Sequence, residues 1–161
     1  MGRKAEPSDK NIYYRSREKI KGLSREKAAE KIGISSTTLG RIELGYISPK
    51  PDDVVAMVEL YGEPSLYNYY CSNDCKIGMD CRIDELKPVG LAEATLGILS
   101  SVNAFNKWKD KFIDIAVDGD VDDDEKEEFK AICKALGEIS TMVERLKLTV
   151  ETSKFSKAKN T

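Results

Sequence analysis

The chain has 161 residues, of which 40% are hydrophobic and 34% charged, with 11 Gly and 5 Pro. These proportions are typical of a soluble, helix-rich globular protein, and the length allows one core with an appendage or two small domains. Histidine is absent, which removes the usual general base and the usual zinc nitrogen ligand and argues against an enzyme. No run approaches the roughly 18 apolar residues that a membrane span needs, and no signal peptide is evident, so we expect a cytoplasmic protein that does not bind a membrane.

Charge is distributed unevenly along the chain. Residues 1–50 carry 12 Lys and Arg against 6 Asp and Glu, whereas residues 51–161 carry 14 against 22. A basic N-terminal part on an acidic remainder indicates that the N-terminal part binds an anionic partner and the remainder does not.

Short helices are predicted for the first part of the chain. A polar, flexible N-terminal arm at residues 1–10 precedes a first helix at 11–21. The second helix is predicted at residues 24–33, and the third follows after a very short turn and ends at Gly45. A fourth begins near Pro51, because proline is favoured in the first turn of a helix. The short connection between the second and third helices predicts a helix-turn-helix.

The third predicted helix lies in the stretch IGISSTTLGRIELG, residues 32–45. Leu39 and Ile42 share one face and are predicted to be buried. An ordinary solvated helix would carry Lys and Glu on the opposite face, but here that face carries Ser36, Thr37, Gly40 and Arg41. Hydroxyls, a glycine and an arginine suit close approach to base edges in the major groove of DNA. The alternative is a helical domain that only packs, with Ser and Thr as capping residues.

Three of the four cysteines, Cys71, Cys75 and Cys81, lie in a segment at residues 71–90 that we interpret as a linker. On a helix Cys71 and Cys75 would lie one turn apart, and with Cys81 they could hold a structural zinc or another soft metal. The same thiols could be a redox sensor or partly buried structural thiols, and we expect no other cofactor. Cys133 lies beside a predicted apolar seam and is interpreted as a core residue.

Residues 91–153 show heptad spacing of apolar residues. Leu91, Ile98, Phe105 and Phe112 recur every seven residues, with Val102 between them, and residues 129–150 continue at steps of three and four. An acidic turn joins the two stretches. Its acids can be placed on a calcium loop, but Ala116 occupies a ligand position and helix capping explains them more simply.

The pattern predicts a long antiparallel hairpin of two helices, followed by a basic tail at residues 154–161. A hairpin alone cannot bury both of its apolar stripes well. We therefore expect a homodimer that forms through residues 91–153.

The stretch GLSREKAAEKIGISSTTLGRIELG followed by SPKPDDVVAMVELYG resembles the Cro/CI-type (XRE) helix-turn-helix domain of phage repressors and many bacterial regulators. It keeps the spacing of cap, alanine, turn glycine, apolar pair, glutamate and terminal glycine. The resemblance implies an all-α, lambda-repressor-like head of four or five helices at residues 11–70, and double-stranded DNA as partner. NYYCSNDCKIG, residues 68–78, is similar to a segment of those regulators in which a helical hairpin follows the head.

The resemblance also implies roles for individual residues. It places the third helix in the major groove, the start of the second helix against phosphate, and the segment after the third helix on the backbone of the other strand. Arg25 stands where the family usually has Gln, and Glu43 should pair with Arg15 or Arg17. The expected DNA-binding residues, including the cap of the third helix, are Ser24, Arg25, Ser35, Ser36, Thr37, Thr38, Gly40, Arg41, Tyr46, Ser48 and Lys50.

These observations together predict a sequence-specific DNA-binding transcription regulator, in the simplest case a dimeric repressor that reads inverted half-sites. The alternative is a protein-interaction adaptor in which the helix-turn-helix and the hairpin are docking surfaces. An enzyme with a cysteine nucleophile would lack both a histidine base and a Gly-rich phosphate loop.

Overall fold

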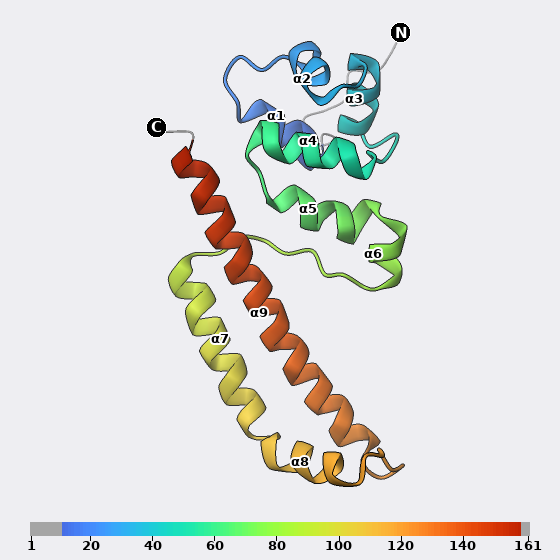
Figure 1. The fold of residues 1–161 in the computed structure, drawn as a ribbon, viewed down its shortest axis with the longest axis vertical. Helices are drawn as coiled ribbons and strands as arrows, with labels where there is room; N and C mark the ends of the chain where they lie inside the picture. Colours follow the sequence, from blue (N-terminus) through green and yellow to red (C-terminus); the bar gives the residue numbers. More distant parts are fainter. Residues whose placement is uncertain (1–10, 159–161) are drawn as a thin grey trace. The chain divides into compact units, whose positions relative to one another are not determined.

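The computed structural model describes residues 11–158, and all regular structure within that range is helical (Figure 1). The described residues form two compact units, one made of residues 11–85 and 152–158 and one formed by Leu86–Glu151. The predicted all-α class is confirmed. The predicted flexible arm at residues 1–10 lies outside the described residues. No helix between residues 11 and 158 has both the length and the apolar character that crossing a bilayer requires.

Five α-helices build the head. Each of the first three begins at a polar side chain that accepts a hydrogen bond from the first turn: Asn11, Ser24 and Ser35. Gly33 caps the end of the second helix, and its φ of 85° is a left-handed conformation that favours glycine and lets the cap of the third helix, Ser35, follow two residues later. The helices are α1 (Ile12–Glu18), α2 (Arg25–Ile32), α3 (Ser36–Glu43), α4 (Pro51–Tyr61) and α5 (Ser65–Tyr69).

One apolar core holds these helices together. Leu39 and Ile42 of α3 are fully buried in it, as the periodicity predicts. Ala28 and Ala29 let α2 approach closely, because a small side chain adds little volume between two helices. The other buried apolar members come from α1, α4 and α5: Tyr13, Val54, Met57, Val58, Tyr61 and Leu66.

A buried ion pair joins α1 to α3. Arg17 donates from Nε to Glu43 Oε1 at 2.5 Å and from Nη2 to Oε2 at 3.3 Å, and the Glu43 side chain is fully buried. Of the two arginines that the resemblance left open, it is Arg17 that pairs. Asn11 strengthens the same junction, since its side-chain amide donates to the Ile42 carbonyl at 2.5 Å. The C-terminal end of α3 is therefore held in place by α1.

We predicted a linker at residues 71–90, but the structure has helices in the first half of that range. A π-helix, η2 (Tyr70–Asp74), and α6 (Lys76–Asp80) continue directly from α5. The backbones of the two approach so closely that a Cβ atom at Gly78 would overlap the Cys71 carbonyl oxygen. Residues 70–85 thus form a small folded part of the first unit, which we call the cysteine lobe, because a glycine permits contact where a larger residue would hold the segments apart.

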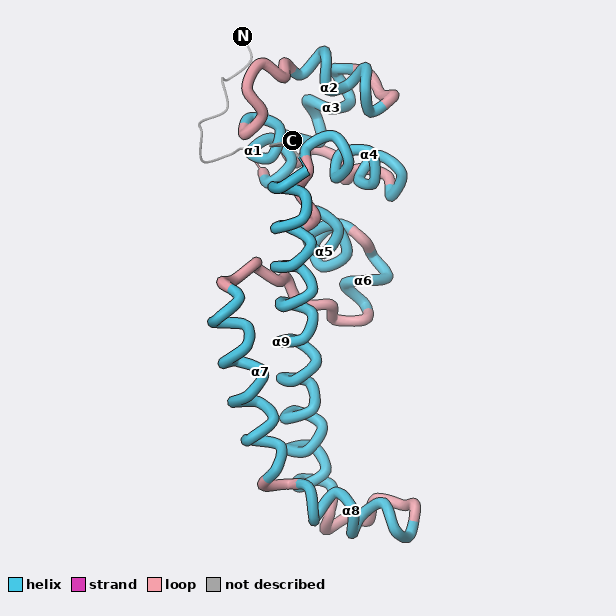
Figure 2. The backbone as a smooth tube through the Cα atoms, turned by 60° about the vertical axis from the view of Figure 1, so that its left-hand side comes forward, coloured by secondary structure: helices cyan, strands magenta, loops and turns pink. Residues whose placement is uncertain are grey.

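In the second unit, α7 (Leu91–Asn106) and the part of α9 (Lys126–Ala158) up to Glu151 lie side by side in both views (Figures 1 and 2). The predicted first long helix is broken, and α8 (Lys109–Asp118) begins after Trp108. The break turns α8 so that the ring of Phe112 packs between those of Phe105 and Phe129, at centroid distances of 6.2 and 6.5 Å. The bent arrangement of α7 and α8 thus lets the three aromatic rings pack together. The last helix also extends beyond residue 153, its predicted end.

The face that α7 turns towards α9 consists mainly of small residues. Ala94 and Ser101 are buried, and a Cβ atom at Gly97 would lie only 2.7 Å from Met142 Sδ. Two members of the predicted heptad pattern, Leu91 and Val102, do not face α9 and are 62% and 38% exposed. A count of large apolar residues cannot detect an interface formed by small ones.

The buried Glu43 generates a stability prediction. Glu43→Ala should lower the free energy of unfolding of the first unit by about 3–5 kcal/mol, because it removes the buried partner of Arg17 and leaves only the half-exposed Glu18 as its counter-charge. Hydrogen exchange of the α1 and α3 amides measures this for the first unit separately from the second. Glu18→Ala is the control, since Glu18 also pairs with Arg17 at 2.7 Å but is half exposed. Equal effects of the two variants would contradict a central role for Glu43.

Candidate nucleic-acid interface

Side chains cap the first turn of α3. Ser35 Oγ accepts a hydrogen bond from the Thr38 backbone N–H at 3.0 Å and shares a second one with Thr38 Oγ1 at 2.8 Å. Both hydroxyls were predicted to contact DNA. Their first role is to satisfy the first turn of the helix, and each keeps capacity for one further hydrogen bond at the helix N-terminus.

The outer face of α3 exposes Thr37 and Arg41, while Ser36 is partly buried. Thr37 and Arg41 are four residues apart and therefore lie one above the other on the same face. A threonine carries both a hydroxyl and a methyl group, and an arginine can donate two parallel hydrogen bonds to guanine, so this pair has the chemistry of a base-reading surface. Gly40, which was predicted to face the groove, is buried.

Arg25 covers Gly40. Its Cδ and Nη1 atoms lie 3.5 Å from the position that a Cβ atom at Gly40 would occupy, and its Nε donates to Glu43 Oε2 at 2.9 Å. The side chain is 37% exposed. Its Nε–H is therefore bound inside the domain while the side chain as a whole keeps partial exposure, and the phosphate contact that the resemblance implies would fall to the terminal nitrogens.

The Glu43 carboxylate receives hydrogen bonds from two arginines, Arg17 and Arg25. Arg17 also pairs with the half-exposed Glu18, so two cations balance two carboxylates in this cluster. An unpaired carboxylate at the end of α3 would repel DNA phosphate, and the two arginines remove that repulsion.

The segment after α3, residues 44–50, carries the other predicted contacts and is called here the α3–α4 turn. Tyr46 is 73% exposed, and Ser48 and Lys50 are also exposed. Ser48 Oγ donates to Asp74 Oδ1 at 3.2 Å. Lys50 precedes α4, and its backbone N–H donates to Asp53 Oδ2 at 3.1 Å. Ser24, at the start of α2, is exposed and caps that helix.

Asp74 was not identified from the sequence, although it contacts both the α3–α4 turn and α1. Its second oxygen, Oδ2, accepts a hydrogen bond from the buried hydroxyl of Tyr13 at 2.6 Å. Burial, followed by this hydrogen bond, raises the pKa of Tyr13, so the phenol remains a donor at neutral pH. Local patterns around Asp74 give no signal for contacts with residues 26 and 61 positions away.

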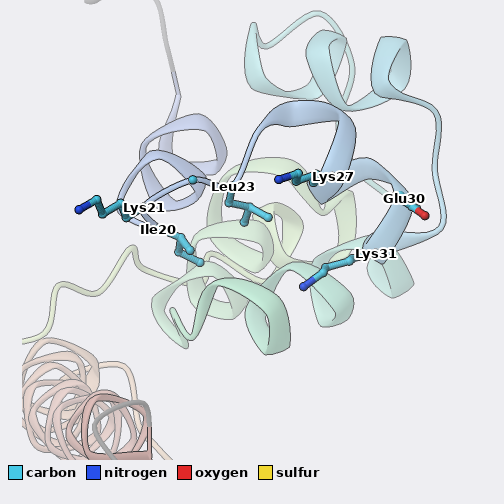
Figure 3. Close-up of a pocket in the computed structure, with 7 residues that line it drawn as sticks. Ile20, Lys21, Leu23, Lys27, Glu30 and Lys31 are labelled. Atoms are coloured by element: carbon cyan, nitrogen blue, oxygen red, sulfur yellow. The ribbon is translucent and has the colours of Figure 1, made fainter.

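A second basic surface lies beside α2. Figure 3 shows Lys21, Lys27 and Lys31 around Ile20 and Leu23, which line a shallow groove. Helical periodicity places Lys27 and Lys31 on a different face of α2 from Arg25. Ile20 and Leu23 pack against the core of the head. We therefore interpret this groove as the margin of the core, separate from the α3 surface.

The three cysteines of the cysteine lobe are free thiols. Cys71 and Cys75 are partly buried and Cys81 is exposed. Over the part of the chain that the structure describes, no three or more Cys, Asp or Glu side chains are grouped so that they could hold a metal ion. The structural zinc stays an untested prediction. Cys133 is exposed, so its predicted place in the core is wrong, because α9 buries the neighbouring Ile132 instead.

Comparison with known proteins gives a family match for the head. A helix-turn-helix family model matches residues 15–68, from α1 to α5. No curated protein and no solved structure matches the chain. The matched residues include the short turn after α2, the capped α3 and the buried pair of Arg17 with Glu43. Residues 15–68 are therefore a helix-turn-helix domain of the Cro/CI (XRE) type, the DNA-binding domain of a transcription regulator.

Proposed function

We propose that this protein is a sequence-specific repressor that binds an operator as a homodimer and acts by occupying it. The observation that carries the proposal is the outer face of α3. Thr37 and Arg41 are exposed there, and Arg25 holds the only acid of that helix, Glu43, in an ion pair. A short exposed helix face without free negative charge matches what the major groove requires.

In the proposed complex, affinity and specificity come from different residues. Arg25, Lys50 and the N-termini of α2 and α3 neutralise or contact phosphates, which supplies most of the affinity and makes it depend on salt. Thr37 and Arg41 read base edges, with Ser36 and Thr38 beside them. Tyr46 and Ser48 contact the backbone next to the groove.

Selection from a random pool of duplex DNA by the purified protein tests this function. We expect enrichment of an inverted repeat whose half-sites lie about one helical turn apart, as two copies of α3 require. Weak binding that does not depend on salt, without enrichment of any sequence, would overturn the proposal and favour the protein-interaction adaptor.

Arg41→Ala should weaken binding to the selected duplex by about 1–3 kcal/mol and relax base preference, since it removes a base contact. Competition binding against the selected and scrambled duplexes measures both effects. Lys31→Ala is the matched control, because it removes the same charge from an exposed position on α2 in the groove lined by Lys21 and Lys27, outside the predicted DNA contacts. If both variants lose affinity equally for all sequences, Arg41 contributes only charge and α3 is not the reading helix.

The homodimer is proposed from the outer face of α7. Leu91, Leu96, Leu99 and Val102 are all exposed, with Leu96 at 67%. Leu96 and Leu99 lie on the opposite side of the helix from the buried Ala94 and Ser101, and Leu91 and Val102 lie on the flank between the two faces. An apolar stripe on both faces of one helix favours a second partner helix, and a second copy of this chain supplies one with the same stripe.

Leu99→Glu combined with Val102→Glu should convert the dimer to a monomer, because two charges would be placed in the proposed interface. Light scattering after size-exclusion chromatography measures the mass. Lys107→Glu is the control, since it changes the net charge by the same amount at an exposed residue that caps the end of α7, beyond the stripe. A monomeric parent, or a double variant that stays dimeric, would contradict the proposed interface.

A further inference from the structure

We propose that Asp74 is a positioning residue for DNA binding, which holds the α3–α4 turn in its binding conformation through Ser48. Asp74 lies outside the residues that the helix-turn-helix family model matches. The inference rests on the proposed function, because it assumes that the α3–α4 turn contacts DNA. It assigns the cysteine lobe a role in that contact.

The carboxylate of Asp74 joins three parts of the first unit. Oδ1 accepts from Ser48 in the α3–α4 turn at 3.2 Å, and Oδ2 accepts from Tyr13 of α1 at 2.6 Å. Tyr13 is 1% exposed, and its ring packs edge to face on Tyr69 of α5 at 5.7 Å. One end of the bridge is therefore anchored in the core, and the other reaches an exposed residue of the candidate interface.

Hydrogen bonds within the cysteine lobe hold Asp74 in place. Asp74 ends η2, and the next residue, Cys75, donates its backbone N–H to the Tyr70 carbonyl at 2.8 Å. Asn68 donates to the Asp84 carbonyl at 3.0 Å, and Asn73 donates to Glu85 Oε2 at 3.2 Å. These bonds close the lobe on itself, so Asp74 is presented by a folded support.

The two halves of the α3–α4 turn are held by different contacts. In the first half, the Gly45 and Tyr46 amides donate to the Ile42 and Arg41 carbonyls of α3, both at 2.9 Å. In the second half, Ser48 bonds to Asp74. The Lys50 amide, in the same half, also donates to Asp53 Oδ2 of α4 at 3.1 Å. Loss of the Asp74 carboxylate should therefore free Ser48 and leave Lys50 held from α4 but not from the cysteine lobe, while α3 keeps its position.

The charge of Asp74 and its positioning role predict opposite effects on DNA affinity when the side chain is removed. Asp74 is an acid close to a surface proposed to bind phosphate, so charge alone predicts that its removal tightens DNA binding. If Asp74 positions the turn, its removal weakens binding, because the loosened turn must be ordered again in the complex.

The experiment compares Asp74→Ala with Asp84→Ala, which removes an equal charge from the same lobe but keeps the Asp84 backbone carbonyl that Asn68 uses. The probe is the duplex that the parent protein selects or, failing selection, a mixed-sequence duplex at low salt. We expect Asp74→Ala to bind about threefold to tenfold more weakly than Asp84→Ala, in line with the loss of one or two hydrogen bonds. Equal or tighter binding by Asp74→Ala would overturn the inference.

A double-mutant cycle tests whether Asp74 acts through Ser48. In a Ser48→Ala background, Asp74→Ala should change affinity by less than about twofold, because the bridge is already broken. Full additivity of the two substitutions would overturn the proposed route. Should Asp74→Ala fold poorly, Asp74→Asn keeps the shape and one acceptor, and the same cycle is run with it.

Hydrogen exchange without DNA separates this inference from the proposed function. The Lys50 amide should exchange faster in Asp74→Ala than in Asp84→Ala, while the amides of α1 and α3 keep their rates. Failure of the parent protein to bind any duplex would overturn the proposed function alone. Unchanged exchange of the α3–α4 turn would overturn the positioning role, whatever the protein binds.

Discussion

The buried carboxylate of Glu43 is the constraint on which the rest of the head depends. A buried acid is tolerated only when cations and hydrogen bonds compensate it, and here Arg17 comes from α1 and Arg25 from α2. The three helices are therefore joined at one point by charge as well as by their apolar faces. Because Glu43 is the last residue of α3, this point also determines how the rest of that helix projects from the domain.

The same geometry divides the residues of α3 between folding and binding. Leu39 and Ile42 belong to the core, Ser35 and Thr38 cap the first turn, and Gly40 lies under Arg25. What is left on the outside is a narrow face with Thr37 and Arg41. A helix this short can read DNA only if its neighbours hold it firmly, and the ion pair, the cap and the covering arginine together provide that rigidity.

The helices of the second unit pack in a different way from those of the head. Small residues on α7 bring it close to Met142 of α9, and its larger apolar residues, such as Leu96 and Leu99, remain outside. A heptad pattern is therefore present in the sequence, but its large residues are divided between the hairpin and the outer stripe. Periodicity identifies the helix and its amphipathic character, whereas the partner of each face depends on which side chains allow close approach.

The sequence by itself determined the helices of the head, their caps, the turn at Gly33 and the burial of Leu39 and Ile42, because these depend on residues only a few positions apart and on backbone geometry. Only the tertiary structure decided that Arg17 is the partner of Glu43, that α8 breaks from α7, and that Asp74 meets Ser48. Such contacts join residues far apart in the chain. Their geometry exists only once the core has brought those segments together, so no local pattern encodes it.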